Sequence, residues 1–283
     1  MRLIRFGLSG YEKPGVELED GTRLDLSETV PDYTPTFFAS GGLSHLQAVL
    51  AAKPHLPEVP QGMRLGPPIA RPHKFIAIGL NYRKHAEEGN HPIPTEPVIF
   101  TKATSCICGP NDDTIIPPGS KKLDYEVELA FVMKNKARHL ASPEEAIARV
   151  AGFMICNDVS ERHFQAERGG QWTKGQSHDT FGPLGPVLVT TSALPDHDNL
   201  ELTLKVNGKV RQNSNTNDLI FGVPYLVWYL SQFMTLEPGD VVTTGTPSGV
   251  GNAMKPPGLL KAGDVVELNI AKLGSQRQVI TAI

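Results

Sequence analysis

Residues 123–133 (LDYEVELAFVM) constrain the fold of this chain more than any other stretch. Apolar side chains alternate there with acidic or small ones, which is the period of a β-strand and not of a helix. One face of the predicted strand is continuously apolar and should be buried. The opposite face carries Glu126 and Glu128, whose carboxylates project the same way and lie about 7 Å apart along the strand.

This acidic pair admits two explanations. Like charges so close on one strand face are unfavourable unless a cation, a cationic side chain or a proton lies between them. Carboxylate oxygens on a rigid strand suit a hard cation such as Mg²⁺, Mn²⁺ or Ca²⁺. A solvated strand face with two ordinary surface acids accounts for the same residues equally well.

A third carboxylate, Asp158, follows a short apolar stretch, residues 152–156, that is predicted to be a strand. The sheet could therefore bring Asp158 near the first two acids. A helix N-cap or a turn explains Asp158 equally well when the residue is taken alone.

The bulk composition argues against several classes of protein. The chain has 283 residues, 40% of them hydrophobic, which suffices for one large domain or for a small and a larger one. Its formal net charge of −3 offers no basic face to nucleic acid or anionic lipid. The longest nearly apolar run, residues 219–230, is too short to span a bilayer, and the N-terminus lacks the apolar region of an export signal.

The three cysteines are an odd number without metal-type spacing, so we interpret Cys106, Cys108 and Cys156 as buried thiols in a reducing compartment. Together these features predict a cytoplasmic protein that binds neither nucleic acid nor membranes.

The pattern along the chain predicts two units. Residues 1–70 form a small N-terminal domain of short strands with one helix, and a proline-punctuated connector over residues 54–72 leads into a β-dominated domain, residues 71–283. In the larger domain we expect strands over residues 74–79, 97–102, 152–156, 200–206, 241–244 and 265–270, a hairpin turn at Asn207-Gly208, and helices over residues 142–150, 157–167 and 222–234.

Two further groups have a possible chemical role. His85 and Glu88 lie three residues apart on a short polar helical turn, so Glu88 could orient the imidazole of His85, although an exposed polar helix face has the same spacing. The glycine-rich segment 245–251 (GTPSGVG) is predicted to be a loop whose free amides could hold a carboxylate.

Taken together, these residues resemble the fumarylacetoacetate hydrolase superfamily over roughly residues 70–280. The resemblance implies an α+β, β-dominated fold, a mixed β-sandwich roll with a small N-terminal domain, and a homodimer. It rests on five motifs in chain order: residues 78–82 (IGLNY) with His85, 126–129 (EVEL), 157–162 (NDVSER), 179–183 (DTFGP) and 245–251 (GTPSGVG).

The resemblance also implies roles for single residues. Glu126, Glu128 and Asp158 would bind Mg²⁺ or Mn²⁺. His85 and Glu88 would form a general-base dyad on a lid that orders over the substrate.

The residues expected to bind a small keto-acid substrate include one departure from the family pattern. By resemblance, Lys102, Gln165 and Thr246 contact the keto-acid end, and we expect Arg83 to help recognise the distal end. The family commonly carries a lysine at the position of Gln176. A neutral amide can hydrogen-bond a carbonyl or carboxylate there but supplies no positive charge to an enolate.

These roles imply Mg²⁺-dependent hydrolysis of a carbon–carbon bond in a 2,4-diketo acid, releasing pyruvate. Residues 5–15 resemble a subgroup often labelled ureidoglycolate lyase, some members of which hydrolyse 2,4-diketo-3-deoxy sugar acids such as L-2,4-diketo-3-deoxyrhamnonate or its L-fuconate counterpart. The same metal site would also suit an oxaloacetate-type decarboxylase or a keto–enol isomerase. Replacement of the lysine by Gln176 leaves open a binder of keto acids without catalysis.

Overall fold

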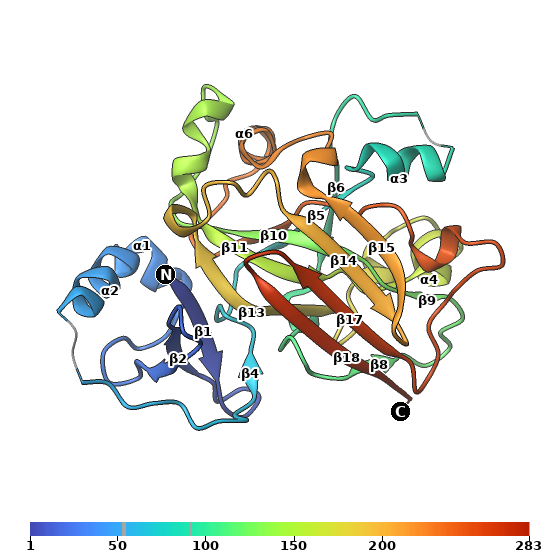
Figure 1. The fold of residues 1–283 in the computed structure, drawn as a ribbon. Coiled ribbons are helices and arrows are strands. Elements are labelled where there is room, and N and C mark those ends of the chain that lie inside the picture. Colours follow the sequence, from blue (N-terminus) through green and yellow to red (C-terminus); the bar gives the residue numbers. More distant parts are fainter. Residues whose placement is uncertain (53–54, 91, 283) are drawn as a thin grey trace.

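The computed structural model describes residues 1–52, 55–90 and 92–282 of the chain. Strands dominate this part, and the helices lie around them (Figure 1). The expected β-dominated α+β fold is confirmed. None of the helices in the described ranges is both long and apolar enough to cross a membrane.

The described strands form two large sheets and one short pair. The larger sheet has eleven strands, whose main path runs β3-β2-β1-β13-β11-β10-β16-β5-β6, and the second has five, in the order β15-β14-β17-β18-β8. The strands of the larger sheet are β1 (Arg2–Phe6), β2 (Lys13–Glu17), β3 (Arg23–Asp25), β4 (Leu65–Gly66), β5 (Phe75–Gly79), β6 (Val98–Lys102), β7 (Ile107–Cys108), β10 (Val127–Met133), β11 (Val150–Asn157), β13 (Gly182–Thr190) and β16 (Val241–Thr243). The second sheet contains β8 (Thr114–Ile116), β14 (Glu201–Val206), β15 (Lys209–Asn215), β17 (Val265–Ile270) and β18 (Gly274–Ala282), and the pair is β9 (Leu123–Asp124) with β12 (Ser160–Glu161).

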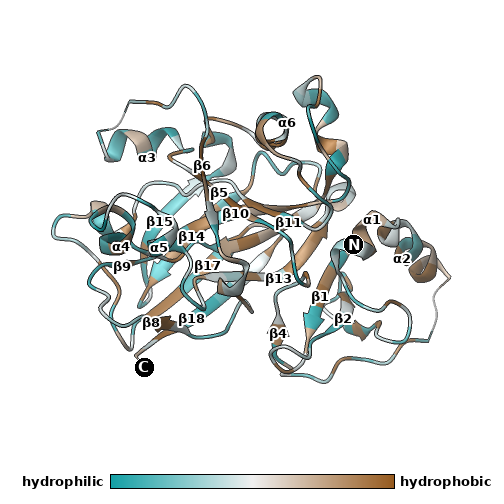
Figure 2. Cartoon of the chain, turned by 180° about the vertical axis from the view of Figure 1, so that it is seen from behind, coloured by the Kyte–Doolittle hydropathy of each residue, from teal (hydrophilic) through white to brown (hydrophobic). Residues whose placement is uncertain are grey.

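The α-helices are short and lie at the edges of the sheets. In Figure 2 the strands β10, β11 and β13 carry brown, hydrophobic residues, whereas α3 is mostly hydrophilic. The core therefore lies in and between the sheets. The α-helices are α1 (Pro35–Ala39), α2 (Gly42–Ala51), α3 (Arg83–Glu88), α4 (Arg162–Ala166), α5 (Thr173–Gln176) and α6 (Val223–Phe233).

The strand expected over residues 123–133 is interrupted. Leu123 and Asp124 pair with β12, whereas the chain from Val127 onward pairs with β11, so the segment changes partner between the two. All residues of strand β10 are buried. Strands β11 and β16 pair with its two edges, and β14 and β17 of the second sheet pack against it. A solvated acidic face is therefore wrong, since Glu128 is 1% exposed and Glu126 is 7% exposed.

The N-terminal segment is joined to the larger sheet. Strand β1 pairs antiparallel with β13, with Leu3 opposite Leu188, and α1 and α2 pack beside it at the blue end of the chain in Figure 1. The hydrogen-bonded sheet thus continues across the domain boundary expected near residue 70, and that boundary stays a prediction. Pro54 of the expected connector lies outside the described residues.

Two expected helices differ from the structure. Residues 143–149 form two short 3₁₀ turns, because Ser142 makes no capping hydrogen bond and so few residues do not sustain an α-helix. The helix expected over residues 157–167 begins only at Arg162, where the Glu161 side chain caps it by accepting from the His163 N–H. The hairpin at Asn207-Gly208 and the long helix α6 are as expected.

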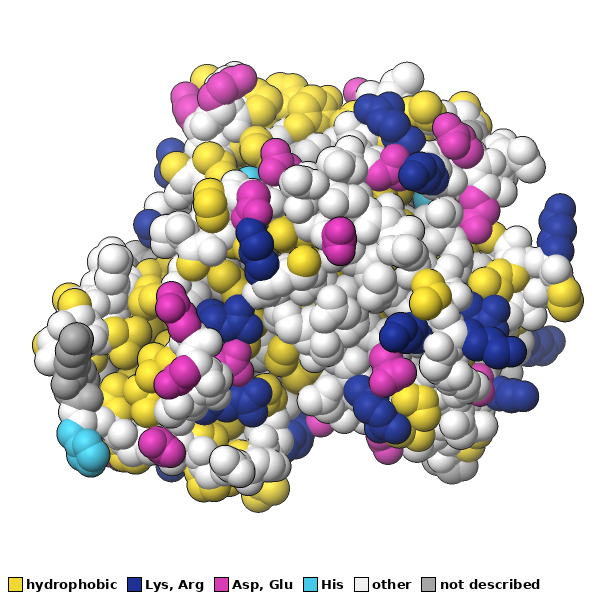
Figure 3. Space-filling model, viewed as in Figure 1, with side chains coloured by type: hydrophobic (Ala, Val, Ile, Leu, Met, Phe, Trp, Pro, Cys, Tyr) yellow, Lys and Arg dark blue, Asp and Glu magenta, His cyan; other side chains and the backbone are white. Residues whose placement is uncertain are grey.

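The charged side chains are mixed on the surface. On the face drawn in Figure 3, Lys and Arg side chains are interspersed with Asp and Glu side chains. Cys106 and Cys156 are buried, Cys108 is half-buried, and all three are free thiols.

Candidate metal centre and active site

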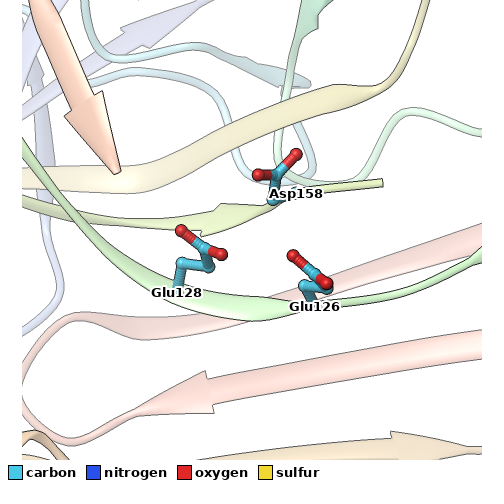
Figure 4. A group of neighbouring side chains, drawn as sticks. All are labelled: Glu126, Glu128 and Asp158. Atoms are coloured by element: carbon cyan, nitrogen blue, oxygen red, sulfur yellow. The ribbon is translucent and has the colours of Figure 1, made fainter. Parts of the chain in front are cut away.

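Three acidic side chains meet where β10 and β11 run side by side. Glu128 lies in β10, Glu126 directly precedes it, and Asp158 directly follows β11. The register places Val127 opposite Asn157, and the Asp158 N–H donates to the Glu126 carbonyl at 2.9 Å. One ligand oxygen from each carboxylate lies within 4.8 Å of the other two, and the three side chains converge in Figure 4. We call these residues the acidic triad.

Enclosing these carboxylates together disfavours their charged forms. Burial raises the pKa of Glu126, an effect that Arg162 opposes and Asp158 reinforces. Burial, with the charges of Asp158 and Glu126, raises the pKa of Glu128 well above its usual range. A divalent cation would offset this electrostatic cost.

The donor set fits a hard divalent cation. Carboxylate oxygens are the ligands that Mg²⁺ and Mn²⁺ prefer. Asp158 Oδ1 accepts a hydrogen bond from Lys102, but Asp158 Oδ2 is buried and has no hydrogen-bond partner among the described residues. A buried carboxylate oxygen without a partner is costly, so Oδ2 is the Asp158 atom available to a metal ion.

Two basic side chains neutralise part of the acidic charge. Lys102 donates to Asp158 at 2.5 Å, and its side chain is 0% exposed. Arg162 donates through Nη2 to Glu126 at 2.5 Å and through Nε to Asp124 at 2.9 Å. Because Arg162 shares its charge with Asp124, the triad keeps a net negative charge when all three acids are ionised.

The dyad residues expected from spacing are in contact. On α3, His85 Nδ1 lies 3.2 Å from Glu88 Oε2. Burial raises the pKa of Glu126, and positive charge on His85, like that of Arg162, opposes this rise. Glu88 also accepts from the backbone of Gly249. Because Arg83, Lys84, Glu87 and Glu88 are exposed, the alternative of an exposed polar helix face stays open.

The glycine-rich loop, residues 245–251, holds carboxylates of the protein itself. The sequence predicted free amides there, but three of them already donate to acidic side chains, which corrects that expectation. The loop thereby ties the triad, the dyad and the partner of Arg162 to one backbone segment. Its bonds run from the Gly245 N–H to Glu128 at 2.9 Å, from the Gly249 N–H to Glu88 at 3.0 and 3.1 Å, and from the Gly251 N–H to Asp124 at 2.7 Å.

Lys102 and Gln176 lie together beside Asp158. Lys102 Nζ donates to Gln176 Oε1 at 2.9 Å as well as to Asp158. Lys174 cannot replace the charge that Gln176 lacks, because it is exposed and its ammonium donates to the carbonyl of Arg168.

The other three residues expected to contact the substrate differ in burial and in hydrogen bonding. Gln165 is buried and accepts from Arg162 at 3.3 Å, next to the triad. The Thr246 hydroxyl donates to the Val127 carbonyl at 3.0 Å and accepts from Gln212 at 2.8 Å, so its proton serves the fold. Arg83 lies exposed at the start of α3.

Sequence reasoning assigned no role to three residues that shape this site: Arg162, Asp124 and Gln212. Arg162 stands in the segment NDVSER, four residues after Asp158, and a basic residue so near a candidate metal ligand was an available signal. Gln212 gave no signal, because its importance depends on the packing of the second sheet onto β10.

A separate cavity of about 750 Å³ lies between the N-terminal segment and residues 104–108. None of the triad residues lines it. Two of the three arginines that line it form ion pairs, Arg5 with Asp32 at 2.7 Å and Arg64 with Asp112 at 2.5 Å.

Comparisons with known proteins agree with this geometry. Residues 74–281 match the family described as fumarylacetoacetate (FAA) hydrolase C-terminal. A protein of Burkholderia multivorans, whose name proposes a hydrolase without a substrate, is 50% identical over 283 residues, covering 100% of this chain and 99% of that protein.

Two similar solved structures come from different enzymes. One, described as a probable 2-hydroxyhepta-2,4-diene-1,7-dioate isomerase from Mycobacterium abscessus, is 32% identical, with a TM-score of 0.85 and coverage of 100% of this chain and 99% of that one. The other is maleylpyruvate hydrolase from Sphingobium sp. SYK-6 in complex with Mn²⁺ and pyruvate, which is 28% identical, with a TM-score of 0.82 and the same coverage.

Proposed function

The chain belongs to the fumarylacetoacetate hydrolase family, and from this premise we propose that it hydrolyses a carbon–carbon bond in a 2,4-diketo acid and releases pyruvate. The observation that carries the proposal is the buried acidic triad beside a histidine–glutamate dyad. Maleylpyruvate, the substrate named for one structural relative, is itself a 2,4-diketo acid, and that relative binds Mn²⁺ and pyruvate.

In this proposal Glu126, Glu128 and Asp158 hold Mg²⁺ or Mn²⁺. When bound, the ion supplies a Lewis acid for the carboxylate and 2-keto oxygens of the substrate. The unpaired Oδ2 of Asp158 supports this assignment.

The dyad would activate water. Glu88, fixed by the Gly249 N–H, accepts the Nδ1–H of His85 and leaves Nε2 free to take a proton. Water then loses its proton to Nε2 as its oxygen adds to the 4-keto carbon. Cleavage of the C3–C4 bond yields a carboxylic acid and pyruvate enolate, and the proton held on Nε2 returns to C3 of the enolate.

The remaining site residues would bind the substrate. Lys102, whose three N–H groups donate to Asp158, Val159 and Gln176, would supply positive charge near the keto-acid end. Gln165 and Thr246 would contact the same end of the substrate. Arg83, exposed at the start of α3, would contact a polar distal group of the substrate. A 2,4-diketo-3-deoxy sugar acid such as L-2,4-diketo-3-deoxyrhamnonate fits this polar character.

One alternative has a specific observation in its favour. A relative with 32% identity is described as an isomerase of an unsaturated keto-acid substrate. An isomerase would use the same triad to move a proton without adding water, so the carbon skeleton would stay intact.

The test is a panel assay that follows pyruvate release in MgCl₂ or MnCl₂, with an EDTA control. The panel contains maleylpyruvate and simpler acylpyruvates, 2,4-diketo-3-deoxyrhamnonate, its fuconate counterpart, and oxaloacetate. EDTA-sensitive pyruvate from a diketo acid is the expected result. Pyruvate from oxaloacetate alone would identify a decarboxylase, and no turnover across the panel would favour an isomerase or a binder without catalysis.

A further inference from the structure

Asp158 is held in place by a closed ring of buried hydrogen bonds. Lys102 donates to Asp158 Oδ1 at 2.5 Å and to Gln176 Oε1 at 2.9 Å. Gln176 Nε2 donates to Ser160 Oγ at 2.9 Å. Ser160 Oγ lies 3.2 Å from Gln176 Oε1 and also 3.2 Å from the Asp158 carbonyl, to which it donates while Nε2 donates to it. The ring thus begins and ends on the same triad residue.

The chemistry of the partners fixes the orientation of the Gln176 amide. Lys102 carries only donors, so Gln176 must turn its oxygen to the ammonium and its nitrogen to Ser160. All three N–H groups of Lys102 then have acceptors, because the third donates to the Val159 carbonyl at 3.1 Å. A Lys102 ammonium with no exposed surface depends on each of these acceptors.

The ring decides which oxygen of Asp158 can reach a metal ion. Lys102 occupies Oδ1, and Oδ2 is left buried with no hydrogen-bond partner in the described part of the chain. If Lys102 lost the Gln176 acceptor, its ammonium could shift and Asp158 could rotate about its side chain. The position of Oδ2 therefore depends on a residue that does not touch the carboxylate.

Gln176 is held rigidly enough for this role. It lies on α5, which packs against α4 and β12. A Cβ on the preceding Gly175 would stand 2.5 Å from the Glu161 carbonyl, so only glycine permits this close approach. The Gln176 side chain itself is 1% exposed.

We propose that Gln176 is a positioning residue that, through Lys102, holds Asp158 with Oδ2 presented to the metal ion. The inference rests on the metal site of the proposed function, and it makes the neutral amide at position 176 a built part of that site. A lysine at this position would bring a second ammonium beside that of Lys102.

The test is calorimetric titration of the metal-free protein with MnCl₂, alongside thermal unfolding. Gln176→Leu keeps the bulk but removes the acceptor, and we expect it to weaken Mn²⁺ binding about 10-fold, in the range for partners that orient metal ligands. Gln176→Glu still accepts from Lys102 but loses the donor to Ser160, so it should weaken binding less than Gln176→Leu does.

Thr216→Val is the matched control. Thr216 is 2% exposed, its hydroxyl both donates and accepts, and it contacts none of the triad. Both Thr216→Val and Gln176→Leu should lower the unfolding temperature, but only Gln176→Leu should weaken Mn²⁺ binding. If Gln176→Leu fails to fold, Ser160→Ala opens the ring from its other side and should weaken binding in the same direction.

The Mn²⁺ titrations either support or overturn the positioning role of Gln176. Unchanged Mn²⁺ affinity in Gln176→Leu, or equal loss in Thr216→Val, would overturn the positioning role. A wild type that binds no Mn²⁺ would overturn both this inference and the proposed metal site. Weaker Mn²⁺ binding in Gln176→Leu, together with no pyruvate from any diketo acid, would support the inference while overturning the proposed function.

Discussion

At the scale of single residues, ionisation of the buried Glu128 carboxyl lowers the stability of the folded chain. Its carboxyl is enclosed beside two other acids, and its pKa is raised well above the ordinary glutamate value of 4.5. A carboxyl group with a higher pKa in the folded chain binds more protons when folded than when unfolded. The stability that this group contributes is therefore lost as the pH rises above the pKa that Glu128 has in the unfolded chain.

This sign gives a prediction for the metal-free protein. After treatment with EDTA, its unfolding temperature should fall as pH rises from about 4.5 towards neutrality, relative to a Glu128→Gln variant that lacks the titrating group. MnCl₂ at neutral pH should restore the wild type but not the variant. Parallel pH profiles of the two metal-free proteins would contradict this account of Glu128.

A second prediction concerns His85. His85→Ala should lower kcat by about 10²- to 10⁴-fold, the usual contribution of a general base, and leave Mn²⁺ affinity intact because His85 is not a triad residue. Steady-state kinetics and Mn²⁺ titration measure the two effects. His45→Ala, an exposed histidine on α2, is the control. Full activity in His85→Ala would remove the dyad from the mechanism.

At the scale of elements, the glycine-rich loop makes the site one unit. Gly249 has a φ of +103° in this loop, and a Cβ there would lie 1.9 Å from the Arg211 carbonyl. Any larger residue must move the backbone whose N–H fixes Glu88. The conformation of the loop therefore affects the position of Glu88 and, through it, of His85.

Gly249→Ala should accordingly lower kcat as well as stability. The conformational strain alone costs about 1–3 kcal/mol, and the displaced N–H would release Glu88 from its position. Gly263→Ala is the matched control, because Gly263 has a φ of +88° but nothing within 4 Å of its added Cβ. Equal kcat in the two variants, with equal loss of stability, would mean that the loop does not position Glu88.

The sequence predicted these elements unevenly. Alternating apolar residues and the Asn207-Gly208 turn are local signals, so the strands and the hairpin could be located. The break between β9 and β10 could not, because it depends on where β11 ends and β12 begins. The helix expected over residues 142–150 was wrong because capping residues alone do not sustain a helix that must end at the start of β11.

The three acids could be grouped from the sequence because strand geometry and motif spacing both point to them. The hydrogen bonds that hold these acids in place could not be predicted from the sequence. The amides of the glycine loop were expected to be free, and only the folded backbone shows that Glu128, Glu88 and Asp124 already occupy them. The hydrogen bond between Lys102 and Gln176 joins residues 74 positions apart, which no local pattern indicates.

At the scale of the whole molecule, side chains of the second sheet form hydrogen bonds next to the triad. Gln212 of β15 accepts from the Val127 N–H at 2.9 Å, between the two glutamates of the triad. Gln278 of β18 accepts from Asn157, whose own side-chain oxygen accepts from the Glu126 N–H at 3.1 Å. Buried amides from one sheet thus complete the backbone hydrogen bonding of the other at the point where the ligands emerge.

The homodimer implied by the family resemblance remains a proposal at this scale. Light scattering coupled to size exclusion should give a mass near twice that of the 30.7 kDa chain. A mass of one chain at micromolar concentration would remove the dimer from the account.

The central claim is that the triad and dyad add water to a diketo acid and cleave it. The most direct test is turnover of maleylpyruvate or another reactive diketo acid in H₂¹⁸O with MnCl₂, followed by mass spectrometry of both products. Brief reactions, with recovered substrate checked for label, control for exchange of its keto oxygens. We predict one solvent-derived ¹⁸O in the carboxylate of the acid co-product. An acid without label, or an isomer with its carbon skeleton intact, would contradict the claim.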